Sequence, residues 1–447
     1  MEDKITKVRN SILRMLLDGK LKEGEKLPSA RILSRKWNIS FVKVQQGLEE
    51  LSKDGILYIA PRSGAYILKG WNNRILQNNL SFYNPKRYLG LLLPIIDIIR
   101  EELPELRPSP DFPESVFEIR TIWALQRARN EYMDLGEFFS DLPEKDSMFF
   151  NAPFQAYSET GKLPGIPILF SPRVIFYNSE ILKKNGCSPP HSMWSFDDFL
   201  KSIEILRKKL PAENIFHLSN QPTCWMNFVF RAGGGLISGK LCDDDIVKID
   251  SPQTIRGFSV YRKIKDALGN VSVNSDNTEF FKGNMAFMMG ARQAVAELTL
   301  SGGVDWGVVP FPALSDGKDF NTMAADLLCV RKNCTNPVLI KKFINVMLSE
   351  KVQDKIGALK FGIPIRKSSA YKSLNLEDFR DSVFIAESSK LISEYNLDST
   401  EIAGMIANHI NNMFNLNENI EHSTRKLADA VRVLIKARET PQCTVAL

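Results

Sequence analysis

The sequence predicts a multidomain protein in which a winged helix-turn-helix (α+β) precedes a larger α/β region. Three helical periodicities and two short strands fill residues 4–69, whereas strand-like apolar runs alternate with helical patterns after residue 88. Residues 1–70 hold 14 Lys and Arg against 8 Asp and Glu, so they carry the whole net charge of +6 of the 447-residue chain. A basic module on a neutral body indicates contact with a polyanion. The alternative is a solvated basic face.

The first two helices are marked by their stop and start signals. Apolar residues from Ile5 to Leu16 recur at helical spacing, and Gly19 ends that helix. After the turn LKEGEKLPS, the side chain of Ser29 is suited to cap a short second helix with Ile32, Leu33 and Trp37 facing inward.

Ser40 is suited to cap a third helix, which ends at Gly55. We expect one apolar face on this helix, formed by Phe41, Val44, Leu48 and Leu51. Two short strands follow, ILYIA and AYILK, joined by a turn at 61–64. Three helices and a hairpin in this order describe a winged helix, whose third helix enters the major groove of DNA.

Residues 4–69 resemble the DNA-binding domain of GntR-family bacterial regulators. The matching segments are GEKLPSAR, SFVKVQQGLEEL, DGIL and RSGAYI, in that order. The residues expected to contact DNA depart from the family pattern. Ala30 replaces the usual acid, and FVKVQ at the start of the third helix replaces a run rich in Arg and Thr. By matched position, the residues placed to contact DNA are Arg31, Lys43, Gln45, Gln46, Arg62 and Gly64. The alternative for each polar side chain is that it is simply solvated.

Residues 71–87 are Asn-rich without a clear period, which predicts a linker. The region 88–447 then reads as α/β. We expect strands at YLGLLLPII, VFEIR, IFYN, MAFMM and DWGVV, and helices at 196–209, 252–268, 337–348, 350–359 and within 402–438.

Residues 135–438 resemble the extracellular solute-binding proteins of ABC transporters, in the maltose-binding-like group. The resemblance rests on ordered segments, among them GKLPGIPILFSPRVIFYNSEILKKNG, WSFDDFLKSIEIL, FVFRAGGGLISGK, EFFKGNMAFMMGARQAV and DWGVVPFPAL. It implies a two-lobed periplasmic-binding-protein-like fold with ligand in the cleft between lobes. The family's Gly-Ser-Trp reads Gly290-Ala291-Arg292 here, so a cation replaces an aromatic ligand contact.

By matched position, the expected ligand-binding residues are Ser171, Arg173, Trp225, Arg292, Asp326 and Arg366. An aromatic ring such as Trp225 suits the apolar face of a sugar, whose hydroxyls need convergent polar groups. The alternatives are core packing for Trp225 and surface ion pairs for Arg173 and Arg292.

Motifs of other functional classes are absent or incomplete. No histidine pattern of a metal hydrolase and no GxSxG elbow occurs. GGLISGKL resembles a P-loop but ends in Leu where a magnesium-binding hydroxyl is needed. Six scattered cysteines without a CxxC pair indicate reduced thiols, and no signal or membrane-spanning segment is visible. We therefore expect no catalytic site, no metal and no cofactor.

These patterns together predict a cytoplasmic bacterial transcription regulator. Its winged helix binds a double-stranded DNA operator, as a homodimer on palindromic half-sites. Its second domain senses a small molecule, for which we expect a sugar or oligosaccharide, and no membrane partner is expected. Two alternatives stay open. The second domain is vestigial and serves dimerisation only, or the chain is a MocR-type regulator using pyridoxal phosphate, with Lys390 after Ser388-Ser389 as a superficial match.

Overall fold

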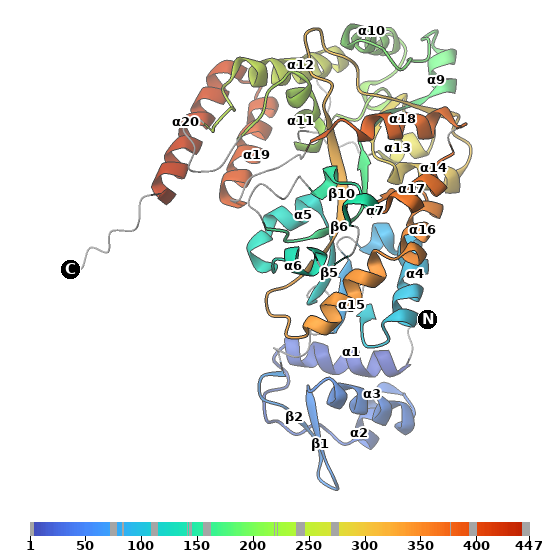
Figure 1. Cartoon of the computed structure of the whole chain (residues 1–447), viewed down its shortest axis with the longest axis vertical. Helices are drawn as coiled ribbons and strands as arrows, with labels where there is room; N and C mark the ends of the chain where they lie inside the picture. The colour runs from blue at the N-terminus through green and yellow to red at the C-terminus, as the bar shows by residue number, and fades with distance from the viewer. Residues whose placement is uncertain are drawn as a thin grey trace, which may run out of the picture.

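A computed structural model of the chain describes residues 4–71, 78–82, 85–108, 115–140, 142, 145–154, 162–218, 220, 222–237, 246–269, 277–375, 377–392 and 400–439. The molecule is elongated, with a small N-terminal domain at one end of its long axis and two larger lobes beyond it (Figure 1). The first lobe is built on a seven-stranded sheet and the second on a three-stranded sheet. The predicted fold class is confirmed.

The N-terminal domain is the expected winged helix-turn-helix. Its elements are α1 (Lys4–Leu17), α2 (Ala30–Trp37), α3 (Phe41–Lys53), β1 (Leu57–Ala60) and β2 (Gly64–Ile67). The Ser29 hydroxyl accepts a hydrogen bond from the Ile32 N–H and the Ser40 hydroxyl from the Lys43 N–H, so both predicted caps form. β1 and β2 pair antiparallel as the wing.

The core of this domain differs from the prediction at Ile32 of α2, which is 56% exposed rather than inward-facing, and at the start of α3. Val44 and Leu48 are buried, but Phe41, which we placed on the same face, is 44% exposed. α1 and α3 lie closest at Gly47, where a Cβ atom would come within 2.7 Å of Val8 Cγ1. Phe41 is the first residue of α3 and lies more than one turn before this contact, so the core does not cover it.

The first lobe contains a mixed sheet. Its strands are β3 (Asn79–Phe82), β4 (Arg107–Pro108), β5 (Phe117–Thr121), β6 (Ile166–Pro172), β10 (Asn321–Val330), β11 (Ile363–Pro364) and β12 (Leu391–Ile392). The order is β11-β6-β10-β5-β3-β4, with β12 beside β10. β10 is antiparallel to β5 and β6, and β3 is parallel to β5. The segment 71–87, which we expected to be a linker, thus includes a sheet strand, and its residues 72–77 lie outside the described residues.

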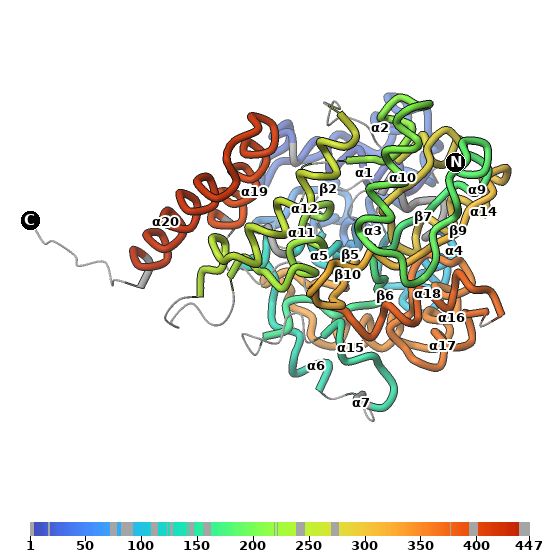
Figure 2. The backbone as a smooth tube through the Cα atoms, turned by 90° about the horizontal axis from the view of Figure 1, so that it is seen from above, coloured from blue at the N-terminus to red at the C-terminus, as the bar shows by residue number. Residues whose placement is uncertain are grey.

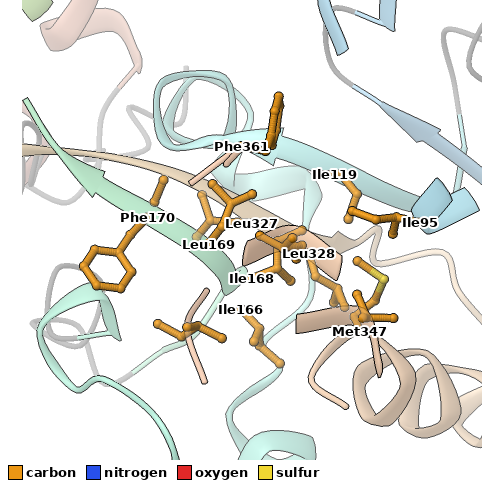
Figure 3. Packing of buried hydrophobic residues seen from close by; sticks show 14 of the residues in the cluster. Ile95, Ile119, Ile166, Ile168, Leu169, Phe170, Leu327, Leu328, Met347 and Phe361 are labelled. Atoms are coloured by element: carbon orange, nitrogen blue, oxygen red, sulfur yellow. The ribbon is translucent and has the colours of Figure 1, made fainter. Parts of the chain in front are cut away.

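Helices pack on both sides of this sheet. They are α4 (Pro85–Glu102), α5 (Ile122–Arg127), α6 (Gly136–Ser140), α7 (Lys145–Met148), α15 (Pro337–Met347), α16 (Glu350–Ala358), α17 (Lys367–Ser373) and α18 (Phe379–Ser388). In the core, Ile168 and Leu328 from neighbouring strands lie close to Met347 of α15 and Ile95 of α4 (Figure 3).

The prediction of a strand at 88–96 is wrong, because this segment lies inside α4. A continuous apolar run does not distinguish a buried strand from a buried helix. The burial of Ile95, Ile96, Ile99 and Leu103 follows helical spacing.

The second lobe is built around the antiparallel sheet β8 (Phe287–Gly290), β7 (Val174–Asn178) and β9 (Trp306–Val309), with β7 central. Its helices are α9 (Ser179–Lys184), α10 (Phe196–Arg207), α11 (Pro222–Arg231), α12 (Pro252–Leu268), α13 (Thr278–Phe281), α14 (Gln293–Ser301), α19 (Thr400–Asn415) and α20 (Ile420–Glu439). α19 and α20 lie side by side on one flank, and α20 packs against α12 (Figure 2). The helix expected at 252–268 has those bounds.

The two lobes meet where β6 ends and β7 begins, at Arg173, and where the chain returns from β9 to β10. The side-chain amide of Asn321 ties these crossings together. Its Nδ2 donates to the Arg173 carbonyl oxygen at 2.8 Å and to the Glu387 carboxylate at 2.6 Å. Glu387 is fully buried and also pairs with Arg231 and Lys390. This junction therefore holds both lobes through one buried carboxylate.

Candidate functional site

The expected DNA-contacting residues lie on α2, α3 and the wing, at the end of the molecule remote from the second lobe (Figure 1). Arg31, Gln45, Gln46 and Arg62 have exposed side chains, and Lys43 is half-buried. The structure thus brings these sequence-predicted residues onto the elements that a winged helix presents to the major groove and the backbone.

The tip of the wing has an unusual backbone. Arg62 and Gly64 both have positive φ, of 65° and 112°. At Gly64 a Cβ atom would also come within 3.1 Å of the Lys26 side chain, so glycine suits this position on two grounds. The turn holds the Arg62 side chain exposed at the end of the hairpin.

The basic side chains of this face are not neutralised by acids. Among the described residues no ion pair is made by these cations, namely Arg31, Arg35, Lys36, Lys43 and Arg62. Unpaired cations on an exposed face are what phosphate binding requires, because each neutralised phosphate releases counterions.

The opposite end of α3 contacts the first lobe. Asp54, the C-cap of α3, accepts hydrogen bonds from Arg9 of α1 at 3.2 Å and from Arg107 of β4 at 2.5 Å. The Arg9 Nη2 also donates to the side-chain oxygen of Asn79 on β3 at 3.3 Å. Burial, reinforced by the charge of Arg107, lowers the pKa of Arg9, while Asp54 opposes this shift. One carboxylate thus joins the recognition helix to two strands of the larger domain.

A cavity of about 390 Å³ lies between the two lobes, next to their junction. The elements around it are the end of β5, the start of α11, the segment from β8 into α14, and β10. Its polar lining comprises Thr121, Arg173, Thr223, Asn277, Gln293 and Asp326, and its larger apolar lining comprises Ile122, Pro222, Phe281, Met288, Met289 and Met323. The volume lies in the range of small-molecule sites.

Asp326 reaches the cavity from the middle of β10, opposite Thr121 of β5. The pairing of β10 with β6 shifts register between Asp326 and Leu327, and such a bulge re-aims a side chain. Backbone donors also lie here, because Thr223 and Gln293 line the cavity in the first turns of α11 and α14, where N–H groups have no partner within the helix.

Asn277 supplies an acceptor on the cavity wall. Its Nδ2 donates to the carbonyl oxygen of Met289 at 3.5 Å. Its Oδ1 is buried and, within the described part of the chain, accepts no hydrogen bond. A buried amide oxygen without a donor is uncommon in native proteins.

The comparisons with known proteins decide the family. The sequence model described as bacterial extracellular solute-binding protein matches residues 121–378. The chain belongs to this family. A second model, bacterial regulatory proteins of the gntR family, matches residues 4–67, so the solute-binding domain is fused to a GntR-type DNA-binding domain. Both predicted resemblances are confirmed.

One curated relative matches the GntR-type domain. It is the uncharacterized HTH-type transcriptional regulator YcxD of Bacillus subtilis (strain 168), 36% identical over 67 residues. The match spans 15% of the length of each protein, so it concerns the DNA-binding domain alone.

Solved structures match the solute-binding domain. The GacH receptor of Streptomyces glaucescens, crystallised unliganded and with acarbose, is 18% identical with a TM-score of 0.65. A solute-binding protein of Thermotoga lettingae bound with α-D-tagatose is 14% identical with a TM-score of 0.68. Each match covers 80% of this chain and 98% of the other. At this identity the likeness shows the fold alone.

Two of the six expected ligand-binding residues, Arg173 and Asp326, line the cavity of the solute-binding domain. Trp225 does not. It is fully buried in the core of the second lobe, packs on Phe258 and donates its indole N–H to the Asn220 carbonyl oxygen at 3.1 Å. The prediction of a stacking tryptophan is corrected, because α11 is buried along most of its length and turns Trp225 into the core.

Arg292 and Ser171 are also removed from the cavity. Arg292 is fully buried, and its guanidinium donates to Asp381 at 2.6 Å and lies over the ring of Phe384. Burial alone would raise the pKa of Asp381, but the hydrogen bond and charge of Arg292 lower it overall. The Ser171 hydroxyl accepts from the backbone N–H of Arg292 and donates to the Pro172 carbonyl oxygen. Both side chains therefore stabilise the fold.

Arg366 is not among the residues that line the cavity. Its guanidinium donates to the Leu348 carbonyl oxygen and pairs with Glu350. The cavity-lining residues that the sequence did not identify include Thr121, Asn277, Phe281 and Gln293. A usable signal existed for Phe281, because it precedes the matched FMMGARQ segment as an aromatic residue in the same motif.

The enzyme-like alternatives gain no support. The matched families are regulators and solute-binding proteins, not enzymes. Burial alone would lower the pKa of Lys390, but the hydrogen bonds that its ammonium donates to the carboxylates of Asp319 and Glu387 raise it, which opposes Schiff-base chemistry. The second half of the P-loop-like GGLISGKL, residues 238–241, lies outside the described residues.

Two kinds of structural feature are absent from the described residues. They contain no cluster of three His, Cys, Asp or Glu side chains placed to hold a metal ion. None of their helices combines the length and apolar character that crossing a membrane needs.

Proposed function

We propose that the chain is a cytoplasmic transcription regulator that binds an operator as a homodimer and senses a carbohydrate in the cavity of its solute-binding domain. The GntR-type domain supports the first part, since its exposed face carries the unpaired cations. The dimer follows from the palindromic half-sites that helix-turn-helix proteins use.

The observation that carries the sensing function is the cavity between the lobes, which is lined by Asp326 and by Asn277, whose buried Oδ1 lacks a donor among the described residues. A sugar hydroxyl can donate to one group and accept from another, so a polyol needs both kinds of partner. Here Asp326 accepts, while Arg173 and the backbone N–H of Gln293, the first residue of α14, donate. Relatives of this fold crystallised with acarbose and α-D-tagatose support the same ligand class.

The fold offers a route from the cavity to the recognition helix. Thr121 lines the cavity at the end of β5, and β5 pairs with β3, which pairs with β4. β4 carries Arg107, whose guanidinium binds Asp54 at the end of α3. Closure of two lobes around a ligand is a known switching mode. A closure of the lobes that shifts β5 would therefore alter the ion pair between Arg107 and Asp54.

The proposal is tested by ligand-dependent stability and DNA binding of the full chain. A panel of monosaccharides and disaccharides is screened by thermal shift, where a ligand at 100 times its Kd adds about 2.7 kcal/mol to the free energy of unfolding. The sugar that raises the melting temperature should change operator affinity in gel shifts.

The matched variants are Asp326→Asn, which alters the cavity wall, and Asp197→Asn, which alters an exposed carboxylate on α10. The first should abolish the shift and the second should preserve it. An operator-binding protein that responds to none of the sugars, or responds equally in both variants, would refute carbohydrate sensing at this cavity.

A further inference from the structure

The first turn of α3 exposes two large apolar side chains. Phe41 is 44% exposed and Val42 is 60% exposed, and Ile32 on the neighbouring α2 is 56% exposed. The buried face of α3 is completed by Val44 and Leu48 without them. The stability of the domain therefore does not account for apolar residues at these positions, since exposing them to water is unfavourable.

The charge around these side chains indicates what covers them. Arg31, Arg35 and Lys36 on α2 and Lys43 on α3 carry no ion-pair partner in the described residues. An apolar centre with an unpaired cationic border matches the major groove, where base edges are flanked by two rows of phosphates. Ser40 caps α3 directly before Phe41, so the exposed pair stands at the tip of the helix that enters the groove.

The major groove offers one prominent apolar group, the C5-methyl of thymine, and phenylalanine is among the side chains that contact it. One turn further along α3, Gln46 is exposed, and glutamine pairs in a bidentate manner with adenine. Building on the proposed operator binding, we infer that Phe41 and Val42 read thymine methyl groups and Gln46 reads adenine. The base pairs beneath the first two turns of α3 are then A·T in each half-site.

The first step of the test selects an operator with the full chain from a pool of randomised duplexes. The expected result is enrichment of A·T pairs at symmetric positions in both half-sites. If no duplex is enriched, operator binding itself is rejected, and that result is distinct from the outcomes that follow.

The second step replaces the thymines of the selected duplex, one symmetric pair at a time, with deoxyuridine, which lacks only the methyl group. The wild-type chain should bind about fourfold more weakly for each methyl that it contacts, since burying a methyl is worth ~0.8 kcal/mol. Phe41→Ala should weaken binding to the thymine-containing operator. At the base pair that Phe41 contacts, the ratio of affinities for the thymine and deoxyuridine duplexes should fall to one, while the ratios at the other base pairs stay unchanged. Val42→Ala should do the same at a different position.

The matched control is Val433→Ala on α20, an equally exposed valine far from α3, which should leave every ratio unchanged. Circular dichroism of each variant checks that the fold is retained. Selective operator binding with equal affinity for thymine and uracil at all positions would overturn the inference and leave the proposed function standing. If Phe41→Ala loses the dimer while the thymine-to-deoxyuridine affinity ratios stay unchanged, Phe41 and Val42 belong to a protein–protein contact. That result would also overturn the inference.

Discussion

Replacing Trp225 by alanine should destabilise the second lobe strongly without any ligand present. The indole is fully buried, its ring centre lies 5.3 Å from that of Phe258, and its N–H donates to the Asn220 carbonyl oxygen. Truncating a buried tryptophan to alanine costs about 3–5 kcal/mol, which combines lost burial with the cavity left behind. The removed hydrogen bond also leaves a buried carbonyl oxygen without its partner.

The assay is urea unfolding followed by circular dichroism. With a denaturant slope of about 3 kcal/mol/M, the expected loss lowers the midpoint by roughly 1–1.7 M. Thr223→Ala is the matched control, because Thr223 lies on the same helix but lines the cavity. Its midpoint should shift by no more than a few tenths of that amount, as is usual for sites outside a packed core.

Two results would refute this reasoning. A midpoint for Trp225→Ala equal to that of the unmodified chain would show that Trp225 is not a core residue. Loss of sugar response in Trp225→Ala with stability intact would return it to the binding site. Operator binding without denaturant should persist, because Trp225 belongs to the lobe remote from the winged helix (Figure 1).

Two further predictions concern ion pairs. Arg107→Ala removes the first-lobe cation from Asp54, so the ratio of operator affinities with and without effector, measured by gel shift, should fall towards one. Arg100→Ala, whose exposed side chain pairs only with Asp97 among the described contacts, should keep the ratio, and an unchanged ratio in Arg107→Ala would disprove the coupling. The pKa of Asp381 lies below its ordinary 3.8, so its pairing with Arg292 stabilises the fold above about pH 4 and is lost as the pH falls through the folded-state pKa. The free energy of unfolding from urea titrations of Asp381→Asn should be lower by about 3–5 kcal/mol at pH 7, and its difference from the unmodified chain should shrink as the pH falls below the ordinary 3.8; a difference independent of pH would contradict this.

Local signals predicted the elements well. Ser29 and Ser40 cap the helices that their positions indicated, and the helix at 252–268 has the expected bounds. Such features depend on residues within a few positions of each other, which a single sequence displays. The segment 88–96 failed because a continuous apolar run fits a buried helix and a buried strand equally well.

The binding site was predicted less well, because its geometry depends on distant contacts. Arg292 is held by Asp381, which lies 89 positions away, so nothing near it in the sequence indicates a buried ion pair. Trp225 lies on a helix that is buried almost all round, and its residue type suits a ligand platform and a core equally. Asp326 lines the cavity beside a shift in the register between β10 and β6, and no local sequence pattern indicates that shift.

The docking of the winged helix against β3 and β4 has a mechanical consequence. The winged-helix domain contacts the first lobe through Asp54, which binds Arg107, whereas the second lobe lies at the distal end of the long axis (Figure 1). If, as proposed, a ligand closes the two lobes, a rotation at the Asn321 junction would displace most the elements farthest from the winged helix, among them α10 (Figure 1). On DNA, an effector would then change the exposed surface of the protein–DNA complex even where the affinity for the operator stays constant. Neighbouring proteins on the same promoter would meet a different surface in each state.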